Sequence, residues 1–247
     1  MSTAPFNDHF SSHAADYARA RPRYPDALFR FLAERAAARE RAWDCATGNG
    51  QAARSLAAHF ARVVATDASA AQIRAATPRQ GVEFRVASAE SSGLDDASVD
   101  LLCVAQALHW FDLERFFAEA GRVLKPGGLL VAWCYGGCLV DDACDRLVQG
   151  LYRALDEYWP PQRRLVEDAY RGIELPGRAV ACPPFAMHAW WSAGDMLDYL
   201  RTWSATTRCA AATGGDPLQR IAGALQDAWG GARRRVSWPL TVKASRM

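Results

Sequence analysis

Lysine is almost absent from this chain of 247 residues, in which Lys125 and Lys243 are the only two. The basic side chains are therefore nearly all arginine, and 29 basic residues against 27 acidic ones leave a formal net charge of +2. So small a charge gives no field that would hold a polyanion by neutralising its phosphates, which argues against a nucleic-acid partner. Any partner must be recognised by a local site.

The sequence also lacks long apolar runs and a dense cysteine framework. No stretch approaches the roughly 18 apolar residues that a membrane span needs, and the opening M-S-T-A-P-F-N-D does not resemble a signal peptide. The seven cysteines are odd in number and dispersed, as is typical of reduced, buried thiols. We predict a soluble, cytoplasmic protein without a membrane partner, either a monomer or a weak dimer.

From residue 42 onward, short apolar strands alternate with helices. Strands are expected at 42–46, 63–66, 82–86, 99–105 and 129–134, and helices at 51–60, 70–76 and 112–124. Alternation of this kind predicts right-handed crossovers and a parallel sheet covered on both faces. The fold class is therefore α/β, with a Rossmann-like, doubly wound, mostly parallel seven-stranded sheet, an antiparallel edge and a helical cap.

After Gly136 the rhythm changes. Helices are expected at 141–159, 192–203 and 217–229, and strands at 185–191 and 233–242. Pro239 restricts the last strand to an edge or a bulge, because proline cannot donate to a β-ladder. No linker separates the two halves, so we predict a single domain over 1–247.

The segment D-C-A-T-G-N-G-Q, from Asp44 to Gln51, joins the first strand to its helix. Its glycines permit backbone angles that other residues avoid, and the helix that follows presents unpaired N–H groups. Asp67 ends the second strand, a position from which a carboxylate accepts the hydroxyls of a ribose. Together these residues indicate a site for a nucleoside-type cofactor, although a tight turn and a helix-capping aspartate would leave the same pattern.

The glycine spacing leaves a second enzyme class open. Gly48 and Gly50, followed by Ala53, also satisfy the dinucleotide fingerprint G-x-G-x-x-A, so an NAD(P)-dependent oxidoreductase is a competing interpretation. Asp44 argues against it, because a carboxylate at the end of the first strand would repel a pyrophosphate. A cofactor with a cationic amino group and a sulfonium would be attracted to that carboxylate.

At this point the chain resembles the class I S-adenosylmethionine-dependent methyltransferases, in particular the type-11 domain and its branch similar to trans-aconitate methyltransferases. The family pattern D-x-G-x-G-x-G is matched from Asp44 to Gly50, with Ala46 in place of the first glycine. That alanine fits if its backbone angle is not left-handed. Further matching motifs are A-T-D-A-S-A-A-Q-I at 65–73, S-A-E at 88–90, A-Q-A-L-H-W-F-D at 105–112 and R-V-L-K-P-G-G at 122–128.

The resemblance implies S-adenosylmethionine as cofactor and assigns residues to it. Asp44 would lie near the cofactor's amino group, and Asp67 would bind the ribose hydroxyls. The remaining predicted cofactor contacts are Tyr17 and Arg21 in an N-terminal lid, Ala46, Gly48 and Gly50 in the glycine loop, Ala68 and Gln72 beside the ribose and adenine, Ala89 and Glu90 at the adenine edge, and Gln106 on the opposite side.

The acceptor site is less defined. His109 is the predicted catalytic base, since an imidazole near neutral pH removes a proton from an oxygen or nitrogen nucleophile; it would serve equally as a packing residue. Trp110 and Tyr135 are the predicted walls of the acceptor pocket. No metal site is predicted. Arginines of the cap are candidates for holding a carboxylate, with a solvated surface as the alternative.

These observations divide the chain into an N-terminal helical lid (1–41), a cofactor-binding half (42–135), a helical cap insertion (136–184) and C-terminal strands and helices that complete the sheet (185–247). We expect an enzyme that transfers a methyl group to a small molecule, through a carboxylate or another oxygen nucleophile. The oxidoreductase remains an alternative, as does a non-catalytic module that binds the cofactor without turnover.

Overall fold

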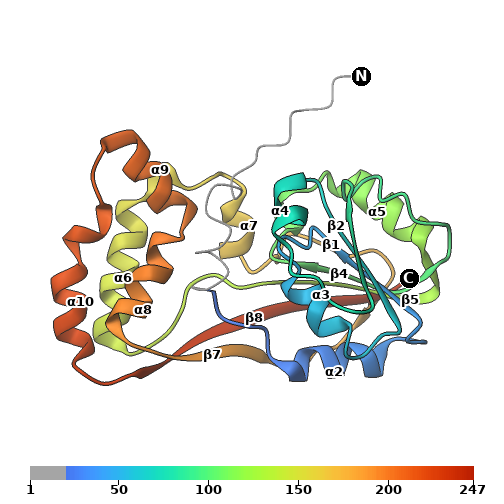
Figure 1. Cartoon of the computed structure of the whole chain (residues 1–247), viewed down its shortest axis with the longest axis horizontal. Helices are drawn as coiled ribbons and strands as arrows, with labels where there is room; N and C mark the ends of the chain where they lie inside the picture. Colours follow the sequence, from blue (N-terminus) through green and yellow to red (C-terminus); the bar gives the residue numbers. More distant parts are fainter. Residues whose placement is uncertain (1–20) are drawn as a thin grey trace.

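The computed structural model describes residues 21–247, and its centre is one mixed β-sheet (Figure 1). The strand order is β3-β2-β1-β4-β5-β8-β6, with β7 paired to β8 outside this path. The strands are β1 (Arg41–Cys45), β2 (Arg62–Asp67), β3 (Val82–Val86), β4 (Val99–Ala105), β5 (Leu124–Cys134), β6 (Arg178–Val180), β7 (Phe185–Trp191) and β8 (Arg234–Arg246). The first five strands run parallel, as the alternating pattern predicts.

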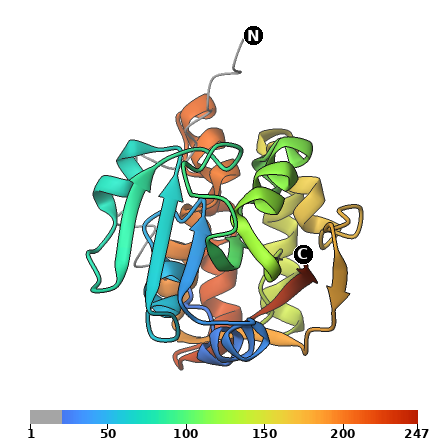
Figure 2. The same cartoon turned by 90° about the vertical axis from the view of Figure 1, so that its right-hand side faces the viewer.

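Helices cover both faces of the parallel strands, which lie side by side in Figure 2. Residues of α2 (Asp26–Arg35) and α3 (Gln51–Leu56) join one buried apolar cluster, and residues of α5 (Leu113–Val123) join the other. The strands supply both clusters because successive side chains point to opposite faces: Ala42 belongs to the first cluster and Trp43 to the second. This is the doubly wound arrangement, completed by α4 (Ala70–Ala75) beside β2 and β3.

The long strand β8 is the main departure from the predicted sheet. Its first half pairs antiparallel with β7, and its second half lies between β5 and β6. The sheet has eight strands and not the predicted seven. The additional strand is β6, which the sequence does not predict because it has only three residues and no recognisable strand pattern. Pro239 lies opposite Ala186 in the part of β8 whose strand partner is β7 alone, as expected for proline at a sheet edge.

A lobe of helices stands apart from the sheet, at the left of Figure 1. It contains α6 (Asp142–Ala154), α8 (Ala193–Arg201), α9 (Ser204–Thr213) and α10 (Ala222–Trp229), with α10 in contact with both α6 and α8. Its helices thus come from both sides of residue 184. The strands β7 and β8 extend from the sheet to this lobe along the lower edge of the view.

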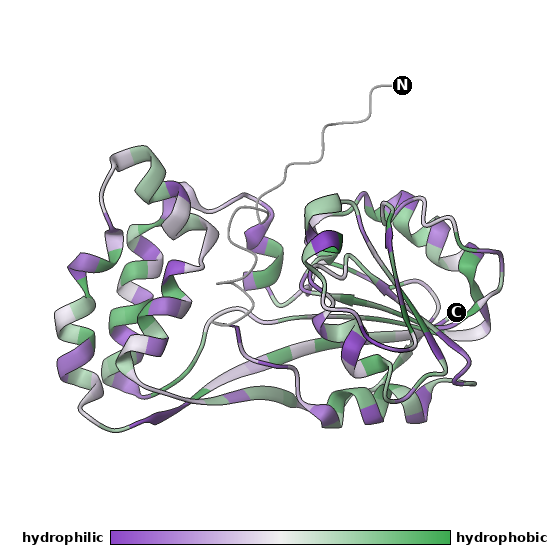
Figure 3. Cartoon of the chain, viewed as in Figure 1, coloured by the Kyte–Doolittle hydropathy of each residue, from purple (hydrophilic) through white to green (hydrophobic). Residues whose placement is uncertain are grey.

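Local sequence signals explain where several of the helices begin. Asp112 caps α5 by accepting from the Arg115 N–H, and Ser192 and Asp195 form a capping box at α8. Helix α9 was not predicted, because its alanine-rich and threonine-rich sequence lacks a clear apolar stripe; Figure 3 shows the mixed hydropathy of the helical lobe. The remaining short elements are η2 (Leu108–Trp110), η3 (Asp156–Tyr158), α7 (Arg163–Glu167) and η4 (Pro217–Arg220).

Within residues 21–247, none of the helices has the length and apolar character needed to cross a membrane.

Candidate functional site

The strand order brings the predicted cofactor residues into one row. Neighbouring strands β3, β2, β1 and β4 are parallel, so their carboxyl ends meet at one edge of the sheet. Asp67 ends β2, the glycine loop follows β1, and Gln106 follows β4. In open α/β sheets, ligands bind at this edge, near the point where the strand order reverses. Here the chain goes from β1 outward to β2 and β3, then returns to β4 on the other side of β1.

The glycine loop contains three left-handed residues, namely Ala46 (φ 55°), Gly48 (φ 56°) and Gly50 (φ 84°). Gly50 is required for a second reason, because a Cβ built there would lie 2.7 Å from the Phe84 ring. The sequence predicts that alanine fits at position 46 if its backbone is not left-handed. The structure contradicts that condition, because the backbone of Ala46 is left-handed. An L-residue in that conformation costs about 1 to 2 kcal/mol, so the loop carries strain where the family pattern has glycine.

Asp67 fastens the loop to the end of β2. One carboxylate oxygen, Oδ2, accepts from the Gly48 N–H at 2.8 Å, and the other, Oδ1, accepts from the Ser69 N–H at 2.8 Å. The side chain is buried, with 8% of its surface exposed. The Thr47 N–H also donates to the Thr66 carbonyl at 2.8 Å. The carboxylate predicted to bind ribose therefore also shapes the glycine loop.

Asp44 is wholly buried beneath the loop. Thr47 Oγ1 donates to its Oδ2 at 2.5 Å, and the Cys103 thiol donates to its Oδ1 at 3.4 Å. Burial raises the pKa of Asp44 to about 6, which the hydrogen bonds from Thr47 and Cys103 only partly offset. Cys103 therefore does more than pack as a small apolar group, and sequence reasoning missed this polar contact. Register could have found it, because Cys103 lies opposite Asp44 on the adjacent strand.

Of the other predicted cofactor residues, Gln72 lies beside the glycine loop. Gln72 Oε1 lies 3.8 Å from the position that a Cβ on Gly48 would occupy, which places it beside the loop. Ala68 is exposed and Ala89 is buried. Glu90 accepts from the Asp112 N–H through Oε1 at 3.2 Å.

Gln106 uses its side chain to hold the end of the next strand. Its Nε2 donates to the Tyr135 carbonyl at 2.8 Å, and its Oε1 accepts from the Tyr135 N–H at 2.9 Å. Tyr135 in turn accepts from Arg21 through its hydroxyl at 2.9 Å, and the Arg21 guanidinium lies 5.1 Å from the centre of the Tyr199 ring. Arg21 is thus near the sheet edge and the helical lobe at once. Tyr17 lies outside the described residues.

His109 is on the 3-10 turn η2, just after β4, with 8% of its surface exposed. Its Nδ1 is 2.9 Å from the Tyr170 hydroxyl, and its ring lies 4.7 Å from that of Trp110, centre to centre. Burial, together with the positive charge of Arg163, lowers the pKa of His109 to about 3. The imidazole is therefore neutral at neutral pH and weakly basic, and its catalytic role stays a prediction.

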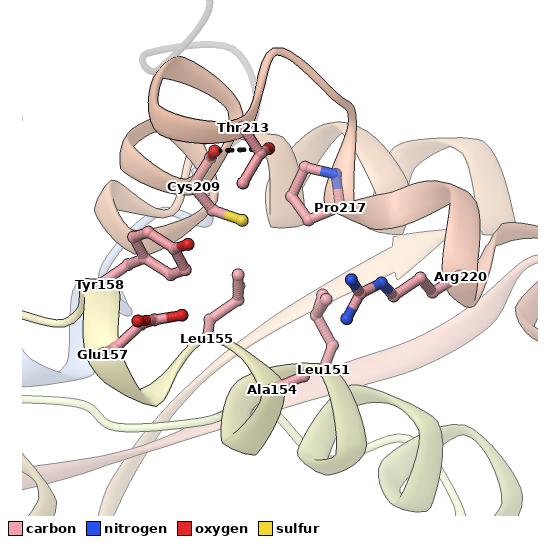
Figure 4. Close-up of a pocket in the computed structure, with 9 residues that line it drawn as sticks. All are labelled: Leu151, Ala154, Leu155, Glu157, Tyr158, Cys209, Thr213, Pro217 and Arg220. Carbon is pink, nitrogen blue, oxygen red and sulfur yellow. Dashed lines mark hydrogen bonds between the residues drawn. The ribbon is translucent and has the colours of Figure 1, made fainter.

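Two further features bear on what binds where. A cavity of about 90 Å³ lies within the helical lobe, away from the predicted site (Figure 4); Leu151 and Leu155 line it with Cys209, and Glu157 and Arg220 flank it. Both of these charged residues are exposed to solvent, and none of the predicted site residues takes part. In the part of the chain that the structure describes, no cluster of three or more histidine, cysteine or acidic side chains is arranged to hold a metal.

Comparison with known proteins agrees with the site geometry. Residues 43–132 match a family model described as a methyltransferase domain. A Dictyostelium discoideum protein named as a methyltransferase is 33% identical over 229 residues, which cover 91% of this chain and 87% of that protein. A solved Anaeromyxobacter dehalogenans structure, named as a type II methyltransferase, has 47% identity and a TM-score of 0.86 and covers 92% of this chain and 97% of its own.

The fold extends to more distant relatives. A Bacillus halodurans structure with 20% identity and a TM-score of 0.54 covers 89% of this chain and 98% of its own, which shows a shared architecture. The oxidoreductase alternative is thereby set aside, since the family match and the relatives above are all methyltransferases. The glycine loop, Asp67 at the end of β2 and these relatives together show that the chain belongs to the class I S-adenosylmethionine-dependent methyltransferases.

Proposed function

We propose that the enzyme binds S-adenosylmethionine at the ends of β1 and β2 and transfers its methyl group to an oxygen of a small molecule. The observation that carries the cofactor assignment is the bond from the Gly48 N–H to Asp67 Oδ2, because it brings the glycine loop and the predicted ribose ligand to one point. The buried carboxylate of Asp44 places negative charge under the loop, where the cationic part of the cofactor would lie.

Methyl transfer to an oxygen is an in-line displacement. The new C–O bond forms as the C–S bond breaks, and the electron pair of the broken bond neutralises the sulfonium, leaving S-adenosylhomocysteine. The protein's contribution is alignment of the two reactants and exclusion of water. Gly48 and Gly50 would approach the cofactor through their backbone, and Trp110 and Tyr135 would flank the acceptor.

A carboxylate is the acceptor group that this site favours. It is already ionised at neutral pH, so its attack on the methyl carbon releases no proton and needs no base. This agrees with His109, whose pKa near 3 makes it a poor proton acceptor at neutral pH. If the acceptor is instead a hydroxyl, His109 is the side chain predicted to remove its proton.

The cofactor assignment is tested by calorimetric titration of the protein with S-adenosylhomocysteine. Replacing Asp67 with alanine removes the acceptor of the ribose hydroxyls and should weaken binding about 10- to 100-fold, the range for hydrogen bonds to a charged group. Asp95→Ala is the matched control, since Asp95 is exposed and lies outside the site.

If Asp67→Ala folds and binds as tightly as the unaltered protein, the ribose is placed wrongly. If the unaltered protein binds no S-adenosylhomocysteine, the cofactor site as a whole is wrong. If S-adenosylhomocysteine binds as expected, the acceptor is identified by incubating the protein with a metabolite extract and methyl-labelled cofactor and detecting the labelled product by mass spectrometry.

A further inference from the structure

Six arginines lie between Gly136 and Pro184, and only one of them is withdrawn from solvent. Arg146, Arg153, Arg164, Arg171 and Arg178 are exposed, whereas Arg163 is half-buried. Its positive charge acts on His109, Cys134 and Tyr170: it adds to the lowering of the His109 pKa by burial, and it partly offsets the rise that burial causes in the pKa of Cys134 and of Tyr170. Arg163 therefore lies close to the ends of β4 and β5, beside the predicted acceptor walls.

Contacts on the side of the sheet and on the side of the helical lobe fix the Arg163 side chain. Its Nη2 donates to the Gly136 carbonyl at 3.2 Å, just past β5. On the helical side, its guanidinium lies 5.2 Å from the centre of the Trp159 ring, and its Nε donates to the Tyr152 hydroxyl at 3.4 Å. A guanidinium held by an aromatic ring loses little freedom when it binds a further partner.

The segment that carries Arg163 is itself anchored to the sheet. Tyr170, which bonds His109, is fully buried, and the Lys243 ammonium of β8 donates to the Tyr170 carbonyl at 2.8 Å and the Ile173 carbonyl at 2.5 Å. Val166 and Ile173 are buried in the apolar cluster under β4 and β5. The position of Arg163 is thus built into the fold and does not depend on an exposed loop.

Arg163 retains unused hydrogen-bond donors. A guanidinium has five N–H groups, and the contacts above use Nε and Nη2. Across residues 21–247, no hydrogen-bond or ion-pair partner is found for its Nη1. A fixed cation with free donors beside the acceptor walls has the charge and the N–H groups that suit an oxyanion.

From this arrangement we infer that Arg163 is a specificity-determining residue that binds an oxyanion of the acceptor, a group separate from the oxygen that receives the methyl. The inference rests on the proposed methyl transfer. The two groups must differ because an attacking carboxylate loses its negative charge as the C–O bond forms. A cation on that carboxylate would stabilise the reactant more than the transition state and slow the reaction. A cation on a second, unreacting anion holds the acceptor equally well throughout.

The acceptor class is therefore a small acid with two oxygen functions, one that anchors and one that reacts. The rings of Trp159 and Tyr152 make the surroundings of the guanidinium aromatic, and an acceptor with a planar or apolar body would suit them. Either a carboxylate or a phosphate would satisfy Arg163, since both present oxygens to a guanidinium.

The test measures binding of three probes by ligand-observed NMR, with the protein saturated with S-adenosylhomocysteine at pH 7.5. Benzoate and phenyl phosphate carry the two candidate anions on a flat apolar body, and benzamide is the neutral match of benzoate. We expect at least one anion to bind and benzamide to bind at least about tenfold more weakly. Arg163→Met should weaken anion binding about tenfold or more, as loss of a charge-assisted bond does, and Arg163→Lys should weaken it less.

Arg164→Met is the matched control and should leave anion binding unchanged, because Arg164 is the exposed neighbour. The inference is overturned if neither anion binds, if benzamide binds as well as benzoate, or if Arg163→Met binds the anions as the unaltered protein does. S-adenosylhomocysteine affinity, measured for every variant, separates these results from failure of the proposed function: it should be the same in all, and its absence in the unaltered protein would instead remove the cofactor site.

Discussion

Strands β1 and β4 lie side by side, yet their ends are built for different tasks. Each is followed by a non-glycine residue in the left-handed conformation, Ala46 after β1 and Gln106 after β4. After β1, the turn opens into a loop that is held by the side chains of Asp44, Asp67 and Arg54. After β4, the Gln106 side chain forms two hydrogen bonds with the Tyr135 backbone. The first end forms the loop of the proposed cofactor site, and the second holds the neighbouring strand.

The comparison shows that residues of two family motifs, each at the end of a parallel strand, make different contacts with the surrounding chain. Resemblance assigned both strand ends to the cofactor. The bonds of Gln106 also give it a positioning task, because Tyr135 is followed directly by Gly136, whose carbonyl accepts from Arg163. Each prediction below perturbs one of the two ends and leaves the other intact.

Removing the Gln106 amide should have the greatest effect. Gln106→Ala keeps the backbone strain but leaves the Tyr135 N–H and carbonyl without their partners, which should cost about 2 kcal/mol of unfolding free energy, or about 1 kcal/mol per bond. Urea denaturation measures the loss. Gln219→Ala, at an exposed position on η4, is the control and should change stability by less than about 0.5 kcal/mol. Equal stability of the two variants would show that the Gln106 bonds contribute nothing.

The second prediction concerns pH and the β1 end. If the cofactor's cationic groups require an ionised Asp44, whose pKa is about 6, affinity for S-adenosylmethionine should fall about tenfold between pH 7 and pH 5. Stability moves the other way: a raised carboxyl pKa in the folded state favours folding at low pH, and this contribution is lost as pH rises from about 4 through 6.

Calorimetry at several pH values measures the affinity, and Asp44→Asn, which does not titrate, is the control. That variant should bind with the same affinity at pH 5 and pH 7. A pH dependence that persists unchanged in Asp44→Asn would assign the titration to a group other than Asp44.

The smallest expected effect is a gain. Ala46→Gly restores the family glycine at a left-handed position (φ 55°) and should raise unfolding free energy by about 0.5 to 1 kcal/mol, because relief of strain exceeds the added freedom of the unfolded chain. Thermal denaturation measures it as a rise in Tm of about 2 °C. Ala76→Gly, at φ −66°, is the control and should lower Tm. A Tm that falls in both variants would mean that Ala46 is not strained.

The parallel half of the fold was predictable because its signals are local. Apolar strands, a glycine turn and capping residues each act within a few positions, and the strands from β1 to β4 lie within one residue of their predicted bounds. Strand β5 begins at Leu124 and not at the predicted residue 129, because the segment with Pro126 and two glycines, predicted as a turn, is part of the strand. The row of predicted cofactor residues follows from the order of those strands. What local pattern could not give was the backbone angle at Ala46, which depends on the turn as a whole.

The acceptor side was harder to predict because distant segments build it. The sequence does not distinguish Arg163 from the five other arginines of the cap. Its contacts with Gly136, Trp159 and Tyr152 do. In the same way, the low pKa of His109 arises from burial and from a charge more than fifty positions along the chain. Such contacts have no signature in sequence spacing.

The double role of β8 has a consequence for how the molecule reaches its folded state. This strand follows every other element in the chain, yet the sheet needs its second half beside β5 and the helical lobe needs its first half beside β7. Neither lobe can therefore complete its pairing during synthesis until residues 234–246 have emerged. Until then β5 presents an open, apolar edge, the kind of surface that pairs with other chains. Pairing of these 13 residues with β5 and β7 covers that edge and joins the sheet to the helical lobe.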